Sequence, residues 1–170
     1  VHDKNKLMEL SKESYELLSK HENYEFWLRQ GTMMTIDWAQ ANSCLPVQNF
    51  KEGVFDDANK INGYTMESMK IRQKGCPYCE MPCGNIVGFR VNSNVGEAEL
   101  DYENVAMLGS NLGINDLNKI SELNYLADIY GLDTISLGNV IGFTIELSEK
   151  KLINEHVEWG DYKVIRELIK

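Results

Sequence analysis

Three of the four cysteines in this 170-residue chain lie within eight residues, in the run CPYCEMPC from Cys76 to Cys83. Thiolates this close in sequence usually bind one metal centre. Three of them on a short loop hold one face of an iron–sulfur cluster or of a zinc ion. Gly75 and Gly84 flank the run and two prolines lie inside it, which favours a tight turn with amides facing the sulfurs. The run therefore predicts a compact metal-binding loop.

The remaining ligands decide between the two metals. Zinc sites usually combine two Cys pairs, or a Cys pair with a His pair, and the chain holds only one further thiol, Cys44. The spacing reverses that of radical S-adenosylmethionine enzymes and differs from the bacterial ferredoxin run. We expect an iron–sulfur cluster, with zinc and three ordinary buried cysteines as the alternatives. Cys44 is expected to be a buried structural cysteine, which leaves the cluster one ligand short within this chain.

Composition limits the class of protein. The length suits one domain with its own core, and the hydrophobic content of 43% is that of a soluble globular protein. A net charge of −9 argues against a nucleic-acid partner, since phosphate recognition needs clustered Lys and Arg. No apolar stretch is long enough to cross a bilayer, so we expect no membrane partner. Clustered cysteines in a chain without a signal peptide favour the cytoplasm and metal ligation over disulfides.

The hydrophobic pattern predicts a mainly α, multi-helical single domain over residues 1–170, with a small β-hairpin near the cysteine run. Leu7, Leu10, Leu17 and Leu18 form one stripe of an amphipathic helix over residues 1–20. Further helices are expected over 23–43 with a break at Gly31, then over 65–73, 101–109, 115–130, 134–148 and 161–169. The hairpin is expected over 86–100, and 44–63 reads as an ordered loop.

The segment from Asp128 to Thr134 reads DIYGLDT and has two interpretations. A carboxylate near a helix end, a chain-reversing Gly131 and a second carboxylate at the next helix start are typical of helix capping. The functional alternative is a pair of carboxylates with exposed amides that accept the N–H donors of a heterocycle such as a pterin.

Several motifs occur together in one order. They are KGCPYC to CG over Lys74–Gly84, DYE from Asp101 with LGSNLG from Leu108, the Asp128–Asp133 segment followed by TISLGN, and a weaker LP with Asn49-Phe50 and Gly53. This set resembles the tungsten-dependent aldehyde:ferredoxin oxidoreductases and their molybdenum or tungsten relatives. The resemblance runs over nearly the whole chain and implies the middle domain of a longer enzyme.

The resemblance implies a role for each motif. Cys76, Cys79 and Cys83 look like three of four ligands of a [4Fe–4S] cluster, whose fourth cysteine lies in a motif outside this chain. Asp128, Leu132 and Asp133 look like the first pterin-binding motif of a tungsten or molybdenum bis-pterin. Glu103 is similar to an active-site glutamate that moves protons, and its alternative is a solvated helix residue.

The resemblance also implies partners and an activity. The intact enzyme, which includes further domains, would oxidise a small aldehyde and pass electrons to ferredoxin or a similar carrier. A homodimer is also consistent with the resemblance. The isolated 170 residues are expected to be inactive. Some members of the family hold a metal between subunits through Glu-x-x-His, but here the pattern reads Glu122-Leu123-Asn124-Tyr125. Two alternatives stay open: a zinc-binding, non-catalytic interaction domain, or a member acting on another substrate such as an aromatic acyl-CoA.

Overall fold

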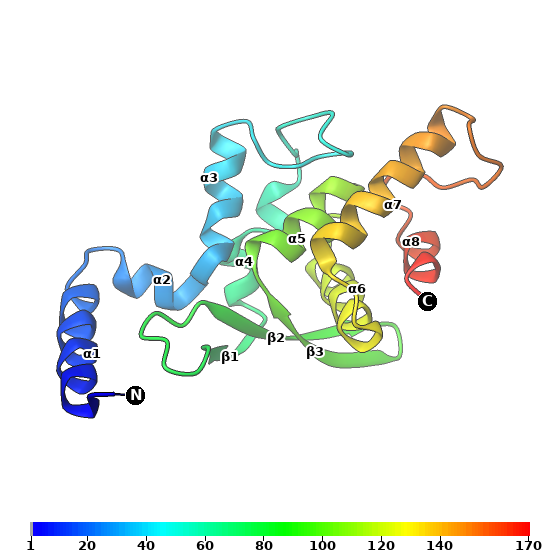
Figure 1. Cartoon of the computed structure of the whole chain (residues 1–170). Helices are drawn as coiled ribbons and strands as arrows, with labels where there is room; N and C mark the ends of the chain where they lie inside the picture. Colours follow the sequence, from blue (N-terminus) through cyan, green and yellow to red (C-terminus); the bar gives the residue numbers. More distant parts are fainter. Residues whose placement is uncertain (1) are drawn as a thin grey trace.

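A computed structural model describes residues 2–170, and helices surround one small sheet in it (Figure 1). The α-helices are α1 Lys4–Ser19, α2 Tyr24–Gln30, α3 Thr35–Ala41, α4 Gly63–Glu67, α5 Tyr102–Leu108, α6 Leu117–Tyr130, α7 Thr134–Glu149 and α8 Tyr162–Leu168. Short 3-10 turns are η1 Gly31–Met34, η2 Ala58–Lys60 and η3 Ser110–Leu112, and the strands are β1 Lys70–Lys74, β2 Gly84–Val91 and β3 Asn94–Leu100. The predicted mainly α class with a small β element is confirmed.

The sheet has the order β1-β2-β3, and both pairings are antiparallel. Lys74 pairs with Gly84 at the point where the chain leaves β1 and enters β2. The connection between them, residues 75–83, therefore contains the whole cysteine run. A two-residue turn joins β2 to β3, with Asn92 in the left-handed region at φ 54°. Helix α6 packs against β2 and β3, so β2 is buried along most of its length.

Strand β1 corrects one expectation. The sequence predicts a helix over 65–73, but α4 ends at Glu67 and the chain continues as a strand from Lys70. A five-residue helix is marginal by itself, whereas pairing with β2 satisfies the backbone of β1. The predicted hairpin over 86–100 is confirmed, extended to Gly84, and joined by this third strand.

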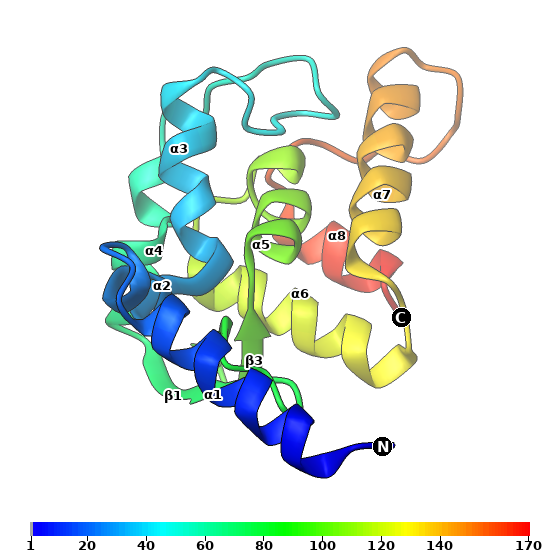
Figure 2. The ribbon, with the colours of Figure 1, turned by 60° about the vertical axis from the view of Figure 1, so that its left-hand side comes forward.

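The core lies where α5 passes between α3 and α7 and rests on α6 (Figure 2). Leu108 of α5, Ile120 and Leu123 of α6, and Ile145 of α7 are fully buried there. Each such side chain contributes about 1.5–3 kcal/mol relative to the exposed state. This packing fixes the end of β3 and the start of α5 beside the cysteine connection.

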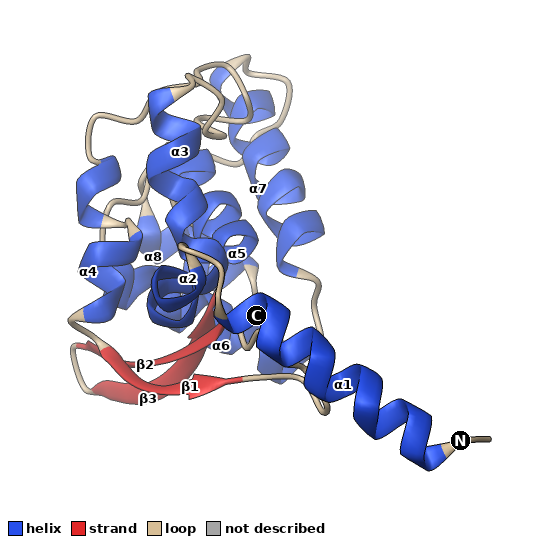
Figure 3. Cartoon of the chain, turned by 90° about the vertical axis from the view of Figure 1, so that its left-hand side faces the viewer, coloured by secondary structure: helices blue, strands red, loops and turns tan. Residues whose placement is uncertain are grey.

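Helix α1 extends away from the rest of the protein (Figures 1 and 3). Asp3 caps it, but none of its residues is buried, and Leu7, Leu10 and Leu17 are exposed. The predicted helix is confirmed, and within residues 2–170 the Leu18 end of its apolar stripe is half-buried while the other three leucines stay exposed. Ser11 nevertheless donates to the carboxylate of Glu80 in the cysteine connection, at 2.5 Å.

Among residues 2–170, no helix has both the length and the apolar character that crossing a bilayer requires.

Glu122 is a buried carboxylate that is paired within the chain. Its side chain is 2% exposed, and Oε1 accepts from Arg166 Nε at 3.1 Å and from Asn94 Nδ2 at 2.7 Å. Tyr125 stands where a Glu-x-x-His pattern would place its histidine. Glu122 thus connects α6 to α8 and to the start of β3.

Arg166→Ala should lower the free energy of unfolding by about 2–4 kcal/mol, because it leaves the buried Glu122 charge without its cation. Urea unfolding at neutral pH measures this. Arg166→Ala combined with Glu122→Gln should regain part of the loss, since a neutral amide is less costly to bury unpaired. A loss of less than about 0.5 kcal/mol for Arg166→Ala would show that solvent, rather than Arg166, satisfies Glu122.

Candidate metal centre

The cysteine connection is a long hairpin loop closed at its base by the Lys74–Gly84 pair. Within it, the Cys79 amide donates to the Cys76 carbonyl at 3.0 Å, which makes a turn. Tyr78, inside this turn, has φ 62° and a fully exposed side chain. The first two thiols are therefore held on one tight turn, as the spacing predicts.

All four thiols are free; Cys76 and Cys79 are exposed and Cys83 is half-buried. Burial raises the pKa of the Cys83 thiol above its ordinary value, and the charges of Asp101, Cys79 and Cys76 raise it further. The three thiols and Asp101 thus lie within electrostatic reach of one another. Because a metal ligand must be a thiolate, a bound cation would displace the Cys83 proton.

The donors fit a thiolate-bound metal in kind, but they are not assembled into a site. Among the described residues, no three Cys, His, Asp or Glu side chains form a group ready to hold a metal. A metal bound by all three thiolates would therefore require them to come closer together than they lie here.

Gly31 brings the end of α2 directly against the cysteine connection. Its backbone has φ 54° and ψ −137°, a conformation open only to glycine. A Cβ at this position would lie 2.1 Å from the Cys83 carbonyl oxygen. The third cysteine is thus placed by a close contact between two backbones.

The pKa of Asp128 responds to two charged side chains, Lys74 and Glu99, at the base of the cysteine connection. Lys74 Nζ lies 2.5 Å from Glu99 Oε2, and both charges act on Asp128. Asp128 is exposed as a residue, yet partial burial of its carboxyl raises its pKa; Glu99 raises it further and Lys74 opposes this. The structure therefore brings Asp128 and the cysteine loop, 45 or more residues apart in sequence, into one electrostatic neighbourhood.

The segment from Asp128 to Asp133 forms helix caps. Gly131 ends α6 in the left-handed conformation at φ 67°, and the Leu132 amide donates to the Ala127 carbonyl at 2.8 Å. Asp133 caps α7 by accepting from the Ser136 amide at 2.8 Å. The capping interpretation is confirmed, and contact with a pterin stays a prediction. Capping does not exclude that contact, because a carboxylate has several acceptor positions.

Glu103 is exposed in the first turn of α5. Burial raises the pKa of its neighbour Asp101. The charges of Glu99 and Glu103 raise that pKa further, whereas a hydrogen bond from Thr32 Oγ1 lowers it. Glu103 is thus a solvent-accessible carboxylate two residues from the acid that acts on Cys83. Its role in proton transfer stays a prediction.

Cys44 corrects another expectation, because it is exposed rather than buried. Ser43 turns the chain after α3 with φ 55°, and Leu45 takes the buried position instead. Sequence alone does not show this one-residue choice, since both side chains are apolar and free Cys is often buried.

The side chains that hold the cysteine connection were missed from the sequence. They come from α2, β1 and β2, and include Trp27, Gln73 and Asn85. No local pattern marks these residues. The alternation along β3 does give a signal for Glu99, because Ala98 and Leu100 are buried on the other face.

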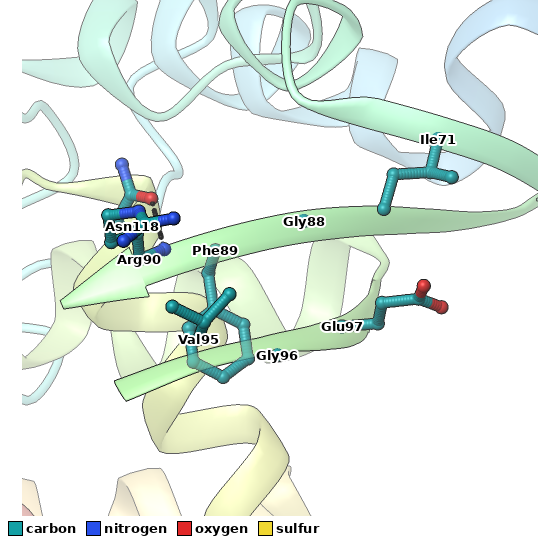
Figure 4. Close-up of a pocket in the computed structure, with 8 residues that line it drawn as sticks. All are labelled: Ile71, Gly88, Phe89, Arg90, Val95, Gly96, Glu97 and Asn118. Carbon is teal, nitrogen blue, oxygen red and sulfur yellow. Dashed lines mark hydrogen bonds between the residues drawn. The ribbon is translucent and has the colours of Figure 1, made fainter. Parts of the chain in front are cut away.

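A hollow of about 490 Å³ lies on the sheet surface and contains none of the predicted site residues. Figure 4 shows its lining: Ile71, Gly88, Phe89, Arg90, Val95, Gly96, Glu97 and Asn118. The Arg90 amide donates to Asn118 Oδ1 there at 2.9 Å, so these two polar groups already have a hydrogen-bond partner within the chain. Nothing in this hollow combines thiols or clustered acids, and it is not the candidate site.

Comparison with known proteins gives a consistent result. The family model described as "Aldehyde ferredoxin oxidoreductase, domains 2 & 3" matches residues 9–170. The chain is 40% identical to the tungsten-containing aldehyde ferredoxin oxidoreductase of Pyrococcus abyssi over 166 residues, or 95% of this chain and 26% of that protein. It is 38% identical to the protein of the same name from Pyrococcus furiosus, over 83% of this chain and 24% of that protein.

A more distant relative carries a different name. The chain is 28% identical to the "Aliphatic sulfonate oxidoreductase, WOR-like subunit" of Pyrococcus furiosus, over 99% of this chain and 28% of that protein. The chain spans about a quarter of the length of these relatives.

Gly31→Ala should lower the free energy of unfolding by about 3 kcal/mol or more, because backbone strain adds to the overlap with the Cys83 carbonyl. Gly131→Ala is the matched control: it has a positive φ but nothing within 4 Å of a Cβ, and should cost about 1–2 kcal/mol. Thermal and urea unfolding measure both. Equal losses for the two variants would contradict the close contact.

Asp101→Asn should flatten the pH dependence of stability above pH 3.8, the ordinary pKa of the carboxyl. Since the folded-state pKa is raised, the wild type is stabilised at low pH and loses that stability as pH rises through the raised value. Asn keeps an oxygen acceptor for Thr32 and for helix capping. Urea unfolding between pH 3 and 7 measures the slope.

Asp133→Asn is the control with the opposite sign. The hydrogen bond with Ser136 lowers the pKa of Asp133, so its contribution is present above pH 3.8 and is lost on further acidification. Parallel pH profiles for wild type and Asp101→Asn would contradict the assigned environment of Asp101.

Proposed function

The chain belongs to the aldehyde ferredoxin oxidoreductase family, and we propose that it is the part that binds an iron–sulfur cluster and contacts a pterin. The intact enzyme would oxidise small aldehydes and transfer the electrons to ferredoxin or a similar carrier. Support comes above all from one observation. Three free thiols occupy one hairpin connection, and the charged side chains of Lys74 and Glu99 at its base also act on the pKa of Asp128. An electron acceptor and a pterin contact would thus be neighbours.

Cys76, Cys79 and Cys83 would hold a [4Fe–4S] cluster as thiolates, with the fourth ligand outside this chain. When bound, the cluster carries single electrons, and a tungsten or molybdenum bis-pterin exchanges electron pairs with substrate. Asp128, Asp133 and the backbone near Leu132 would accept N–H donors of the pterin. The exposed α6–α7 corner leaves their remaining acceptor positions accessible.

Glu103 would take up or deliver protons as the substrate is oxidised. Its place in the first turn of α5 leaves the carboxylate accessible, which a proton-transfer group needs in order to reach substrate.

The substrate class rests on the relatives with higher identity, which are named for aldehydes. A more distant relative is named for aliphatic sulfonates, which makes a sulfonate a second candidate substrate. Aldehyde-dependent reduction of a redox dye by the intact enzyme, compared with a sulfonate and an aromatic acyl-CoA, decides among them. The isolated chain should reduce no dye, because it lacks part of the proposed ligand set.

Anaerobic reconstitution with iron and sulfide tests the metal centre on the 170-residue chain. Because one proposed ligand lies outside this chain, the wild type should retain only labile iron. Cys79→Ser should lower that amount about tenfold or more, because it removes a direct ligand, and Cys76→Ser and Cys83→Ser should do the same. Cys44→Ser is the matched control and should retain iron as the wild type does. Iron content and the electron paramagnetic resonance signal are the measurements.

Two outcomes would contradict the proposal. A stable, paramagnetic cubane on the wild-type chain alone would remove the need for a ligand from outside it. Equimolar zinc after purification, with folding lost on chelation, would favour a zinc-stabilised interaction domain instead.

A further inference from the structure

Four successive backbone carbonyls at the end of the cysteine connection each accept a hydrogen bond from a side chain outside it. The donors are Tyr24 Oη to Glu80 O at 3.3 Å, Trp27 Nε1 to Met81 O at 3.3 Å, Gln73 Nε2 to Pro82 O at 2.7 Å, and Asn85 Nδ2 to Cys83 O at 3.0 Å. Figure 1 shows the connection between β1 and β2 extending toward α1 and α2. Connections of this kind usually leave their carbonyls to water, so four side-chain donors in a row need a reason.

The bonds determine which way the peptide groups face. No cis peptide occurs in the described chain, and in a trans peptide the N–H points opposite to the C=O. With the carbonyls of 80–83 directed to α2, β1 and β2, the amides of Met81 and Cys83 point to the other side of the connection.

Amide groups that face thiolates stabilise negative charge on sulfur and influence both metal affinity and reduction potential. We propose that Tyr24, Trp27 and Gln73 are positioning residues: they clamp the carbonyls of residues 80–82 so that the loop amides face a thiolate-bound metal. This inference rests on the metal centre of the proposed function. It adds donor residues that lie on α2 and β1, outside the cysteine motif itself.

Tyr24 offers the sharpest variant, because the Glu80 carbonyl that it holds shares a peptide group with the Met81 N–H. The Met81 carbonyl held by Trp27 precedes Pro82, which has no N–H. Tyr24→Phe removes only the hydroxyl donor, whereas Trp27→Phe removes the indole N–H and part of a ring that borders an apolar cavity of about 310 Å³. Trp38→Phe, on the exposed surface of α3, is the matched control.

The first measurement needs no metal. Amide hydrogen exchange of Met81 should rise about fivefold to tenfold in Tyr24→Phe, the range expected for loss of one net hydrogen bond. Exchange in β2 and β3 and the unfolding temperature should stay as in the wild type and in Trp38→Phe. Unchanged exchange at Met81 would overturn the clamp.

The second measurement uses Co²⁺ alone as the probe, read by its thiolate charge-transfer absorbance. Wild type and Trp38→Phe should bind alike, while Trp27→Phe combined with Tyr24→Phe should bind about tenfold more weakly. Equal affinity in all three would show that the clamp is only structural and would overturn the proposal while leaving the metal centre intact. A variant with Cys76, Cys79 and Cys83 all changed to Ser should lose Co²⁺ binding. If it binds Co²⁺ as tightly as the wild type, the metal centre is overturned, and the clamp with it.

Discussion

One buried amide joins the three segments on which the candidate site depends. Asn85, at the start of β2, is fully buried, and its Nδ2 donates to the carbonyls of Gln30, Cys83 and Leu100 at 2.9–3.2 Å. These carbonyls end α2, the cysteine connection and β3. Each would be costly to bury without a donor, so α2, the connection and β3 can meet only where the amide reaches all of them. Gly31 makes the same junction possible sterically, because it leaves room for the Cys83 carbonyl.

Around this junction acidic side chains outnumber the basic ones whose charges act on them. Lys74 is the cation shared by Glu99 and Asp128, while Asp101 adds negative charge beside Cys83. An acidic, partly desolvated environment disfavours thiolates until a cation arrives. The raised pKa of Cys83 favours its protonated thiol in the empty loop. The buried junction therefore places the loop, while the turn from Cys76 to Cys79 leaves both of these thiols exposed.

The helices could be predicted because their signals are local. Asp116, Gly131 and Asp133 mark helix ends through capping chemistry, and the periodic apolar residues of α5 to α7 face the core. Strand β1 could not, since Lys70 to Lys74 acquire their strand structure by pairing with β2. Cys44 could not either, because the left-handed turn at Ser43 decides whether it or Leu45 is buried.

By itself the sequence determined the cysteine spacing, the helix caps and the family resemblance, because each depends on residue identity at short spacing. Tertiary structure alone decided that Asp128 lies near the cysteine connection and that donors from α2 and β1 hold its carbonyls. The physical reason is range. A capping bond or a Cys-x-x-Cys turn spans a few residues, whereas the Trp27 and Gln73 hydrogen bonds exist only after α2 and the sheet have packed together.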